Sequence, residues 1–289
     1  MDNTLYDYSP ITERPKITWP GGARLAFYVG LNVEHFVLDA PSTSLTKMTE
    51  HLKPDPLNHG WRDYGNRVGI WRLIEIFDRY GVRPSVLLNS DVAAFYPQVI
   101  QAGIARRWAW LAHGKNNSTL HSGLSAEEEP RLLAEIVDTI ERGTGYRPKG
   151  WMGPALTETH QTPALLKELG LNYVLDWTAD DQPFPLNVEG MISVPYSVEM
   201  NDINFFVFHS FTGAQFAEMV IDQFEQLYSD SEASGRVMPL ALHPFVIGQA
   251  MRAGHLDKVL KHITAHKDVW VTTSDEIAAH YIAHNVPGD

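Results

Sequence analysis

Two kinds of hydrophobic pattern alternate along the chain. Short continuous apolar runs are typical of buried parallel strands, and apolar residues three or four positions apart are typical of amphipathic helices. The predicted strands span residues 24–31, 84–88, 108–112, 150–153, 173–176, 192–195, 239–242 and 269–272. The predicted helices span residues 68–80, 91–102, 126–144, 162–170, 214–229, 256–266 and 274–280.

The order of these segments is strand, helix, strand, helix, without a Ser/Gly linker or an internal repeat. This order predicts one parallel sheet covered by helices, either open or closed into a barrel. We expect an irregular N-terminal arm over residues 1–22 and a single domain over residues 23–289, with a long loop at 36–62. Ser125 with Glu128 resembles a capping box for the helix that follows.

Composition narrows the possible partners. The net charge is −12, so no basic face is expected for nucleic acid or for an anionic membrane surface. The chain has no cysteine, which excludes disulfides, thiolate zinc sites and cysteine nucleophiles. Residues 1–15 do not have the pattern of a signal peptide, and no apolar run is long enough to span a bilayer. We therefore expect a cytoplasmic protein with a small-molecule substrate.

Polar side chains follow four of the predicted strands. In parallel α/β folds the carboxyl ends of the strands meet at one edge, where active sites form. The candidates are Asn32 and Glu34, His113 and Asn117, Asp176 and Asp180, and His243.

Each candidate has a chemical and a structural interpretation. Glu34 is either a general base or metal ligand, or a solvated carboxylate at the strand end. His113 precedes a glycine turn that would present the imidazole, with Asn117 one helical turn later, or it bonds to backbone. His243 is either a proton donor or a packed core histidine.

The remaining candidates would support these groups. Asp176 or Asp180 could orient a histidine, or belong to a solvated acidic loop together with Asp181. Trp151, Gly153 and Pro154 could form a wall whose backbone N–H groups serve as an oxyanion hole. Weaker candidates of the same kind are Glu199, Asn201 and Asp202. The segment 61–65 could form a substrate lid or an oligomer contact. The remaining histidines His255, His262 and His266 are expected on the surface of one helix.

The order of these motifs, over roughly residues 20–279, resembles the polysaccharide deacetylase superfamily, whose fold is a distorted (β/α) barrel. The resemblance implies a base and a metal ligand at Asn32 and Glu34. It also implies two further metal ligands at His113 and Asn117, and a general acid at His243. There is no phosphate-binding glycine loop, Gly-x-Ser-x-Gly elbow or His-Glu-x-x-His helix.

Departures from the family pattern point to one branch. Asn32 stands where the family has a base aspartate, Asn117 where it has a second metal histidine, and the arginine expected near residues 151–154 is missing. An asparagine is a weak zinc ligand and not a base at neutral pH. The pattern is more similar to allantoinase-like and cyclic-imide hydrolases, which open small cyclic amides. The shared runs are residues 19–24, 64–72, 150–151, 194–196 and 201–202.

The sequence therefore predicts a hydrolase of non-peptide carbon–nitrogen bonds that opens a cyclic amide, imide or ureide. Glu34, alone or with His113, would activate water and His243 would protonate the leaving nitrogen. Asn32, Asn117 and N–H groups near Gly153 would hold the carbonyl oxygens. No cofactor is expected, and the branch favours homo-oligomers. The alternatives are a deacetylase of an N-acetylated sugar with zinc at Glu34, His113 and Asn117, and a non-catalytic small-molecule-binding relative.

Overall fold

A nine-stranded sheet forms the centre of the computed structural model, which describes residues 3–40 and 42–285. Residues 1, 2, 41 and 286–289 of the predicted arm and domain lie outside the described residues. The strands are β1 (Leu25–Val33), β2 (Ser85–Leu88), β3 (Ala109–Ala112), β4 (Gly150–Trp151), β5 (Tyr173–Val174), β6 (Phe184–Pro185), β7 (Ile192–Ser193), β8 (Arg236–Leu242) and β9 (Val269–Val271).

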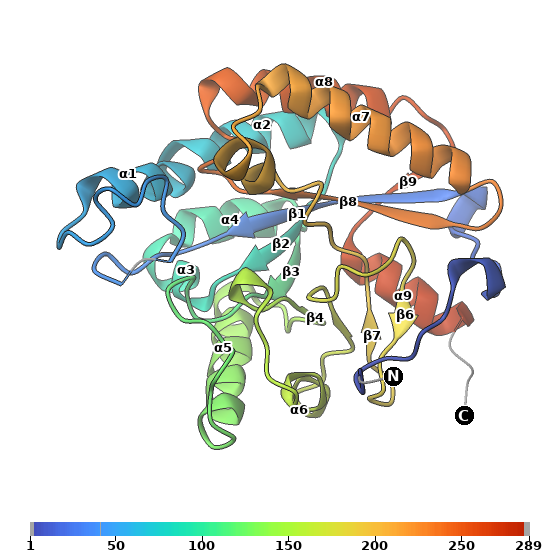
Figure 1. The fold of residues 1–289 in the computed structure, drawn as a ribbon, viewed down its shortest axis with the longest axis horizontal. Coiled ribbons are helices and arrows are strands. Elements are labelled where there is room, and N and C mark those ends of the chain that lie inside the picture. The colour runs from blue at the N-terminus through green and yellow to red at the C-terminus, as the bar shows by residue number, and fades with distance from the viewer. Residues whose placement is uncertain (1–2, 41, 286–289) are drawn as a thin grey trace.

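The sheet order is β6-β7-β5-β4-β3-β2-β1-β8, with β9 paired to the start of β1. Every pairing is parallel except that of β6 with β7. The sheet curls, but β8 and β6 at its two ends are not paired with each other, so the barrel stays open on one side (Figure 1). The predicted α/β fold, a distorted barrel with a mostly parallel sheet, is confirmed.

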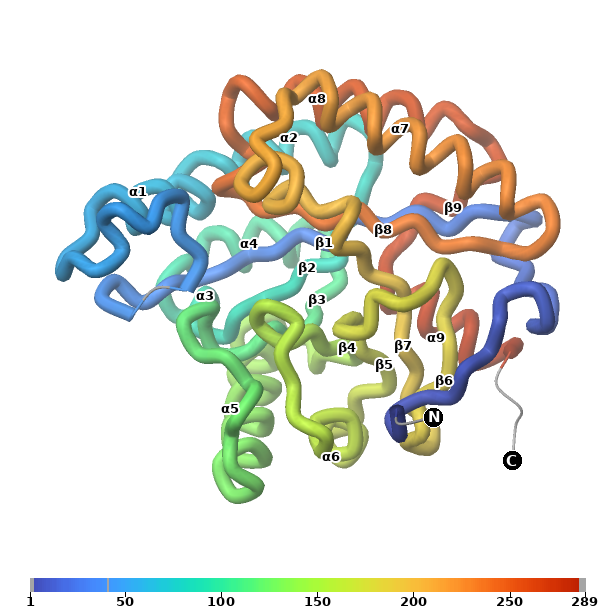
Figure 2. The backbone as a smooth tube through the Cα atoms, viewed as in Figure 1, coloured from blue at the N-terminus to red at the C-terminus, as the bar shows by residue number. Residues whose placement is uncertain are grey.

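Helices cover the outside of this sheet. In Figure 1 α2, α7 and α8 lie along one side of β1 and β8, and α5 and α6 lie beyond β3 and β4. Figure 2 shows the N-terminal arm running beside β6 and β7 before it enters β1. The helices are α1 (Pro56–Tyr64), α2 (Ile70–Tyr80), α3 (Ser90–Phe95), α4 (Pro97–Ala105), α5 (Glu128–Thr144), α6 (Thr162–Glu168), α7 (Gly213–Asp230), α8 (Ala250–Ile263) and α9 (Ser274–Asn285).

Two sequence predictions about helices were wrong. The loop predicted over 36–62 contains the start of α1, where the Asp55 side chain accepts a hydrogen bond from the backbone N–H of Asn58. The single helix predicted over 91–102 is two helices, because Pro97 lacks an N–H and forces Tyr96 out of helical geometry (φ −132°, ψ 56°). The antiparallel strand β6 was also missed.

The register of β1 explains where the polar residues at its end point. All nine of its residues are buried. Leu25, Phe27 and the other odd-numbered residues join the apolar cluster that also contains residues of α2, α5, α7 and α8. Ala26 and Tyr28 join a second cluster, formed by interior strand residues and by residues of α9. Because side chains alternate along a strand, Asn32 shares the interior face with Tyr28. The sequence predicted that Asn32 follows the strand, but the strand extends to Val33 and Asn32 lies within it.

Among the residues that the structure describes, no helix combines the length and the apolar character that crossing a bilayer requires.

Candidate active site

Three predicted strand ends converge on the carboxylate of Glu34. This side chain is only 3% exposed, and its Oε1 accepts a hydrogen bond from Asn117 Nδ2 at 2.5 Å. The Nε2 atoms of His113 and His243 lie 3.4 Å and 3.8 Å from the same oxygen. The other oxygen, Oε2, is buried and has no partner within the protein. Glu34 is thus held through one oxygen and presents the other.

The ring orientation of His113 follows from its backbone partner. Its Nδ1 lies 2.7 Å from the carbonyl oxygen of Met152. A carbonyl only accepts hydrogen bonds, so Nδ1 carries a proton and Nε2 faces Glu34. A neutral imidazole would then place an acceptor opposite the carboxylate. A shared proton, a water or a cation between the two would remove that conflict.

His243 is held by a buried carboxylate, that of Asp202. Its Nδ1 lies 2.7 Å from Asp202 Oδ1, and its backbone N–H donates to Asp202 Oδ2 at 2.7 Å. Burial lowers the pKa of His243, but the negative charges of Asp202 and Glu34 and the hydrogen bond to Asp202 outweigh it and raise the pKa above its usual value. The prediction that Asp176 or Asp180 orients a catalytic histidine was wrong for His243, because Asp202, a weaker candidate, takes that position.

Asn32 presents an acceptor to the site. Its Nδ2 donates to the Tyr196 hydroxyl at 3.1 Å and to the Leu242 carbonyl at 3.2 Å. Its Oδ1 is buried without a partner. The expectation that Asn32 holds a carbonyl oxygen is therefore corrected, since its free atom accepts and would bind an N–H group. Tyr196 was not a sequence candidate, although it belongs to one of the shared runs.

Asn117 orients Glu34 and is itself oriented by Asn89. The backbone N–H of His35 donates to Asn89 Oδ1 at 2.9 Å, which leaves Asn89 Nδ2 to donate to Asn117 Oδ1 at 3.1 Å. Asn117 must therefore turn its Nδ2 towards Glu34. Both ends of its amide have protein partners, so the prediction that it binds substrate is corrected. Asn89 directly follows β2, the same signal that identified the other strand-end residues.

This chain of amides also tests the metal alternative. A cation held by Glu34, His113 and Asn117 would need the Asn117 oxygen pointing inwards, but the backbone N–H of His35 fixes the opposite orientation through Asn89. Asn117 instead directs an N–H donor at the Glu34 oxygen that would bind the cation. In this orientation Asn117 does not offer its oxygen to a cation beside Glu34 and His113.

The predicted oxyanion hole beside Trp151 is not available. The N–H of Gly153 donates to Asp176 Oδ1 at 2.7 Å, and the N–H of Met152 donates to the Ala112 carbonyl at 3.0 Å. Trp151 is fully buried, and its indole nitrogen has no partner. Residues 151–154 thus form a wall behind His113, with Pro154 beside Gly114, and supply no free N–H at Gly153.

Asp176 belongs to a second acidic centre that includes Glu158. Burial raises the pKa of Asp176 well above its usual value, and the negative charge of Glu158 raises it further. Burial, partly offset by the Trp177 indole, raises the pKa of Glu158 to about 7. Glu158 was missed by the sequence reasoning, because it lies in a polar turn rather than at a strand end.

Asp180 lies with the N-terminal arm, not with the catalytic histidines. Its two carboxylate oxygens accept hydrogen bonds from Arg14 at 2.7 Å and 2.6 Å. Asp180 thus fixes the arm against the segment that follows β5, and its contribution to a substrate site stays a prediction.

A cavity of about 980 Å³ lies on the open side of the barrel, between the arm, residues 178–187 and β8. Backbone hydrogen bonds cross this opening at two places, from Val237 to Asp181 and from Ala241 to Met200. The cavity reaches Tyr196, whose hydroxyl contacts Asn32, but none of the three predicted catalytic residues lines it. The cavity and the candidate chemistry are therefore adjacent and distinct.

Comparisons with known proteins agree with this fold. No family model matches the chain. A putative polysaccharide deacetylase from Schizosaccharomyces pombe is 26% identical over 235 residues, 75% of this chain and 73% of that protein. A solved probable polysaccharide deacetylase from Pseudomonas aeruginosa has a TM-score of 0.84 at 26% identity, covering 94% of this chain and 95% of that one.

A second solved structure, PuuE allantoinase, also has a TM-score of 0.84 at 26% identity, covering 97% of this chain and 99% of that one. These two likenesses extend over almost the whole chain. The resemblance seen in the sequence is confirmed: in sequence and in fold the chain is similar to proteins of the polysaccharide deacetylase superfamily.

Proposed function

We propose that this protein opens a small cyclic amide, imide or ureide with Glu34 as general base and His243 as general acid, without a metal ion at Glu34. The broader expectation, a hydrolase of carbon–nitrogen amide bonds, is confirmed by the superfamily. The observation that carries the finer proposal is the Glu34 carboxylate, held by Asn117 and flanked by His113 and His243.

The base is the free oxygen of Glu34. Asn117 and the two imidazoles surround Oε1, whereas Oε2 is buried without a protein partner. Buried polar atoms are almost always partnered, so this position suits a water molecule or a substrate group. A water bound there would lose its proton to Glu34 as it attacks the ring carbonyl. Such a positioned base contributes about 10²–10⁴-fold to a rate.

The acid is His243. Because Asp202 accepts a hydrogen bond from Nδ1–H, the Nε2 atom of His243 faces Glu34 and the reacting group. A raised pKa keeps the imidazolium form available near neutral pH. His243 can then deliver a proton to the ring nitrogen as the carbon–nitrogen bond breaks. Asp202 is a positioning residue, since it acts only through His243.

The polarity of the site supports an N–H-bearing ring. Asn32 Oδ1 is a buried acceptor without a partner, and Asn32 touches the Tyr196 hydroxyl. A cyclic imide or ureide presents an N–H between or beside carbonyl groups, which an acceptor and a hydroxyl would match. The likeness to a solved allantoinase over 97% of this chain supports a ureide as one member of that class.

The experiment is a substrate panel with protein freed of metal by a chelator. We expect ring opening of hydantoin, succinimide or allantoin, and its loss in Glu34→Gln and His243→Gln. Arg79→Gln, which removes a surface ion pair with Asp257, is the control that should keep full activity. Hydrolysis of an N-acetylated sugar alone, restored by added zinc, would overturn the proposal in favour of the metal-dependent alternative. Tight ring binding with no turnover would favour a non-catalytic relative.

We also propose a homo-oligomer in the cytoplasm, as the resembling branch and the composition suggest. Light scattering on the purified protein tests the first part, and a mass equal to one chain would contradict it.

A further inference from the structure

Three ligand-type side chains meet on the outer surface of the barrel, where α7 packs on α8. Glu225 comes from α7, His262 from the last turn of α8 and His266 from the residues just after it. One ligand atom of each lies within 4.8 Å of the others. Among the described residues this is the one group of three or more such side chains that meets that distance.

Hydrogen bonds hold two of the rings in position. His262 Nε2 lies 2.6 Å from Glu225 Oε1. His266 Nδ1 lies 3.0 Å from the backbone carbonyl of His262, so it donates its proton there. That bond leaves the lone pair on Nε2, and a backbone partner of this kind fixes the tautomer of metal-binding histidines.

Aromatic packing restricts the same rings further. Phe224 is fully buried, and its ring lies 4.8 Å from that of His266 and 5.6 Å from that of His262. The Tyr228 ring lies 5.0 Å from His266 on the next turn of α7. The two imidazole rings are therefore packed against aromatic side chains of α7, unlike an isolated pair of surface histidines.

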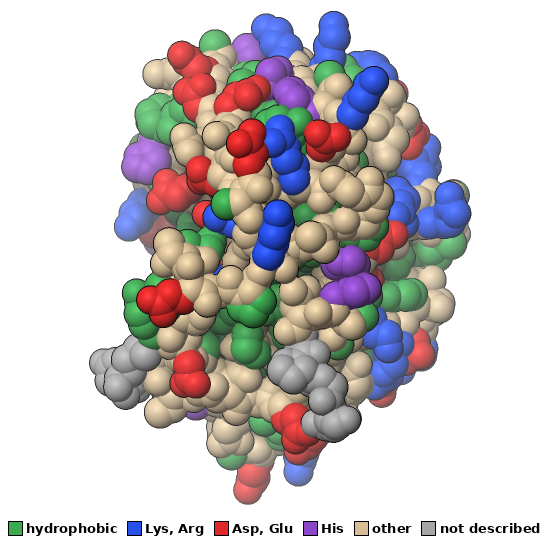
Figure 3. Space-filling view, turned by 90° about the vertical axis from the view of Figure 1, so that its right-hand side faces the viewer, with side chains coloured by type: hydrophobic (Ala, Val, Ile, Leu, Met, Phe, Trp, Pro, Cys, Tyr) green, Lys and Arg blue, Asp and Glu red, His purple; other side chains and the backbone are tan. Residues whose placement is uncertain are grey.

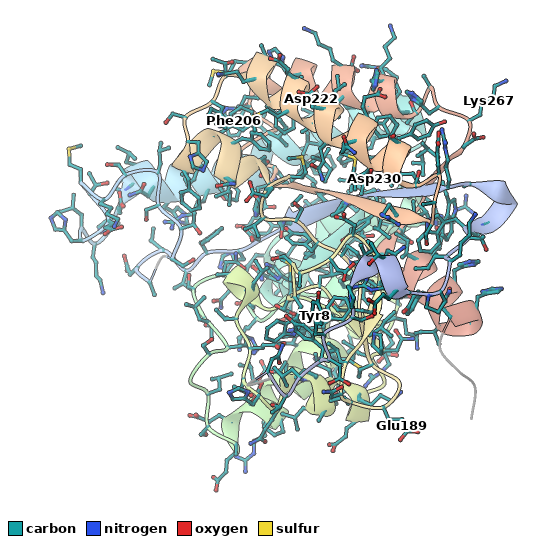
Figure 4. The ribbon with its side chains drawn as sticks, turned by 45° about the vertical axis from the view of Figure 1, so that its right-hand side comes forward. Tyr8, Glu189, Phe206, Asp222, Asp230 and Lys267 are labelled. Atoms are coloured by element: carbon teal, nitrogen blue, oxygen red, sulfur yellow. The ribbon has the colours of Figure 1, made fainter. Side chains whose placement is uncertain are left out.

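Topology places this cluster away from the catalytic edge. The end of α7 leads into the start of β8, and the end of α8 leads into the start of β9. Glu225, His262 and His266 therefore lie towards the amino ends of the strands, whereas Glu34 follows the carboxyl end of β1. In Figure 4, Asp222 and Asp230 mark α7 and Lys267 marks the chain just after α8. Histidine and acidic side chains gather on the corresponding upper part of Figure 3.

We propose that Glu225, His262 and His266 form a binding site for a divalent transition metal, with zinc as its natural class of ion. Two imidazoles and one carboxylate are a common three-ligand zinc set, with water in the fourth position. Imidazole also favours zinc, nickel and copper over magnesium and calcium. Ligands about 2.0 Å from zinc in a tetrahedron lie roughly 3.3 Å apart, so the Glu225–His262 pair opens slightly on binding.

The site links α7 to the end of α8 and does not touch the reacting groups. It also changes how metal content is interpreted, because zinc found in the purified protein would not identify a metal-dependent reaction. The proposal is independent of the proposed function, since it concerns different residues and a different readout.

The test is calorimetric titration of chelator-treated full-length protein with zinc chloride, with magnesium chloride as the comparison. We expect one saturable zinc site and no magnesium binding. His262→Ala, His266→Ala and Glu225→Gln should each weaken zinc binding at least about tenfold. Cobalt chloride should give the visible absorption of a four-coordinate ion, lost in the same variants. Far-UV circular dichroism confirms that each variant is folded.

The matched control is a second histidine pair of the same spacing. His280 and His284 lie on α9 with stacked rings 4.2 Å apart, and His284 Nδ1 bonds to the His280 carbonyl. No acid completes a three-ligand group around them among the described residues. His284→Ala should leave zinc affinity unchanged. No saturable zinc binding, or binding that is lost in Glu34→Gln and kept in His262→Ala, would overturn the proposal.

Discussion

Two acidic centres, Glu34 just after β1 and Asp176 after β5 with Glu158 from the turn beyond β4, have different surroundings. Glu34 has an amide N–H and two imidazole nitrogens around one oxygen. Asp176 and Glu158 are two acids buried beside each other. The backbone N–H of Gly153 donates a hydrogen bond to one oxygen of Asp176, and the other oxygen has no partner. The comparison shows that a carboxylate is not a general base merely because it follows a strand. The groups around a carboxylate decide whether it can act as one.

The largest expected effect separates the two centres by activity. Glu34→Gln keeps the shape of the site but removes the base, so kcat/KM should fall about 10²–10⁴-fold. Glu158→Gln should change it less than about tenfold, because Glu158 contacts none of the three catalytic groups. Steady-state assays on the best ring substrate compare the two. Equal losses in both variants would end the distinction.

A second substitution makes Glu34 resemble the other centre. Asn117→Asp replaces the N–H that holds Glu34 with a second carboxylate, and repulsion between like charges should cost on the order of 10²-fold in kcat near pH 7. The loss should shrink in more acidic buffer, where one carboxyl keeps its proton. A uniform loss at every pH would mean that Asn117 has a different role.

The pH profile tests the Asp202–His243 pair. His243 must be protonated to act as acid, so activity should fall as pH rises through its raised pKa. Asp202→Asn removes a main cause of that increase, so the alkaline limb of the rate profile should move to lower pH. If the alkaline limb does not move, it reports the titration of another group. An equal loss of rate at all pH values would indicate that Asp202 has a purely structural role.

The smallest expected effect concerns stability. The folded-state pKa of Glu158 is about 7, above its ordinary value of 4.5, so the folded protein holds this proton more tightly than the unfolded chain. Stability associated with that proton is present below about pH 4.5 and is lost as pH rises through about 7. Glu158→Gln should therefore raise the free energy of unfolding by about 1–3 kcal/mol at pH 8 and leave it unchanged at pH 4.

Denaturant unfolding at the two pH values measures this difference. A variant that is less stable than the parent at pH 8 would show that ionised Glu158 has a stabilising partner.

The sequence predicted the parts of the fold that depend on local signals. The capping box was correct, since Ser125 and Glu128 bond reciprocally at 3.2 Å just where α5 begins. Gly170 takes the left-handed conformation (φ +87°) that follows α6. The break at Pro97 had a visible cause that the apolar spacing obscured, and β6 was too short to leave a pattern.

The site was predictable as a set of strand ends but not as a network. Strand alternation and topology bring Glu34, His113 and His243 together. The partner of each side chain depends on atoms far apart in sequence, such as the Asp202 carboxylate, 41 residues before His243. The orientation of Asn117 depends on a backbone N–H at His35, which no spacing rule reveals. Glu158 and the arm contact of Asp180 were hidden for the same reason.

The most direct test of the central claim is the rate of ring opening by chelator-treated His262→Ala protein, measured before and after zinc is added. The variant removes a ligand of the proposed surface site, so any effect of zinc reports on the catalytic centre. The account predicts the same rate in both conditions, abolished by Glu34→Gln. A rate that vanishes on chelation and returns with zinc would contradict it.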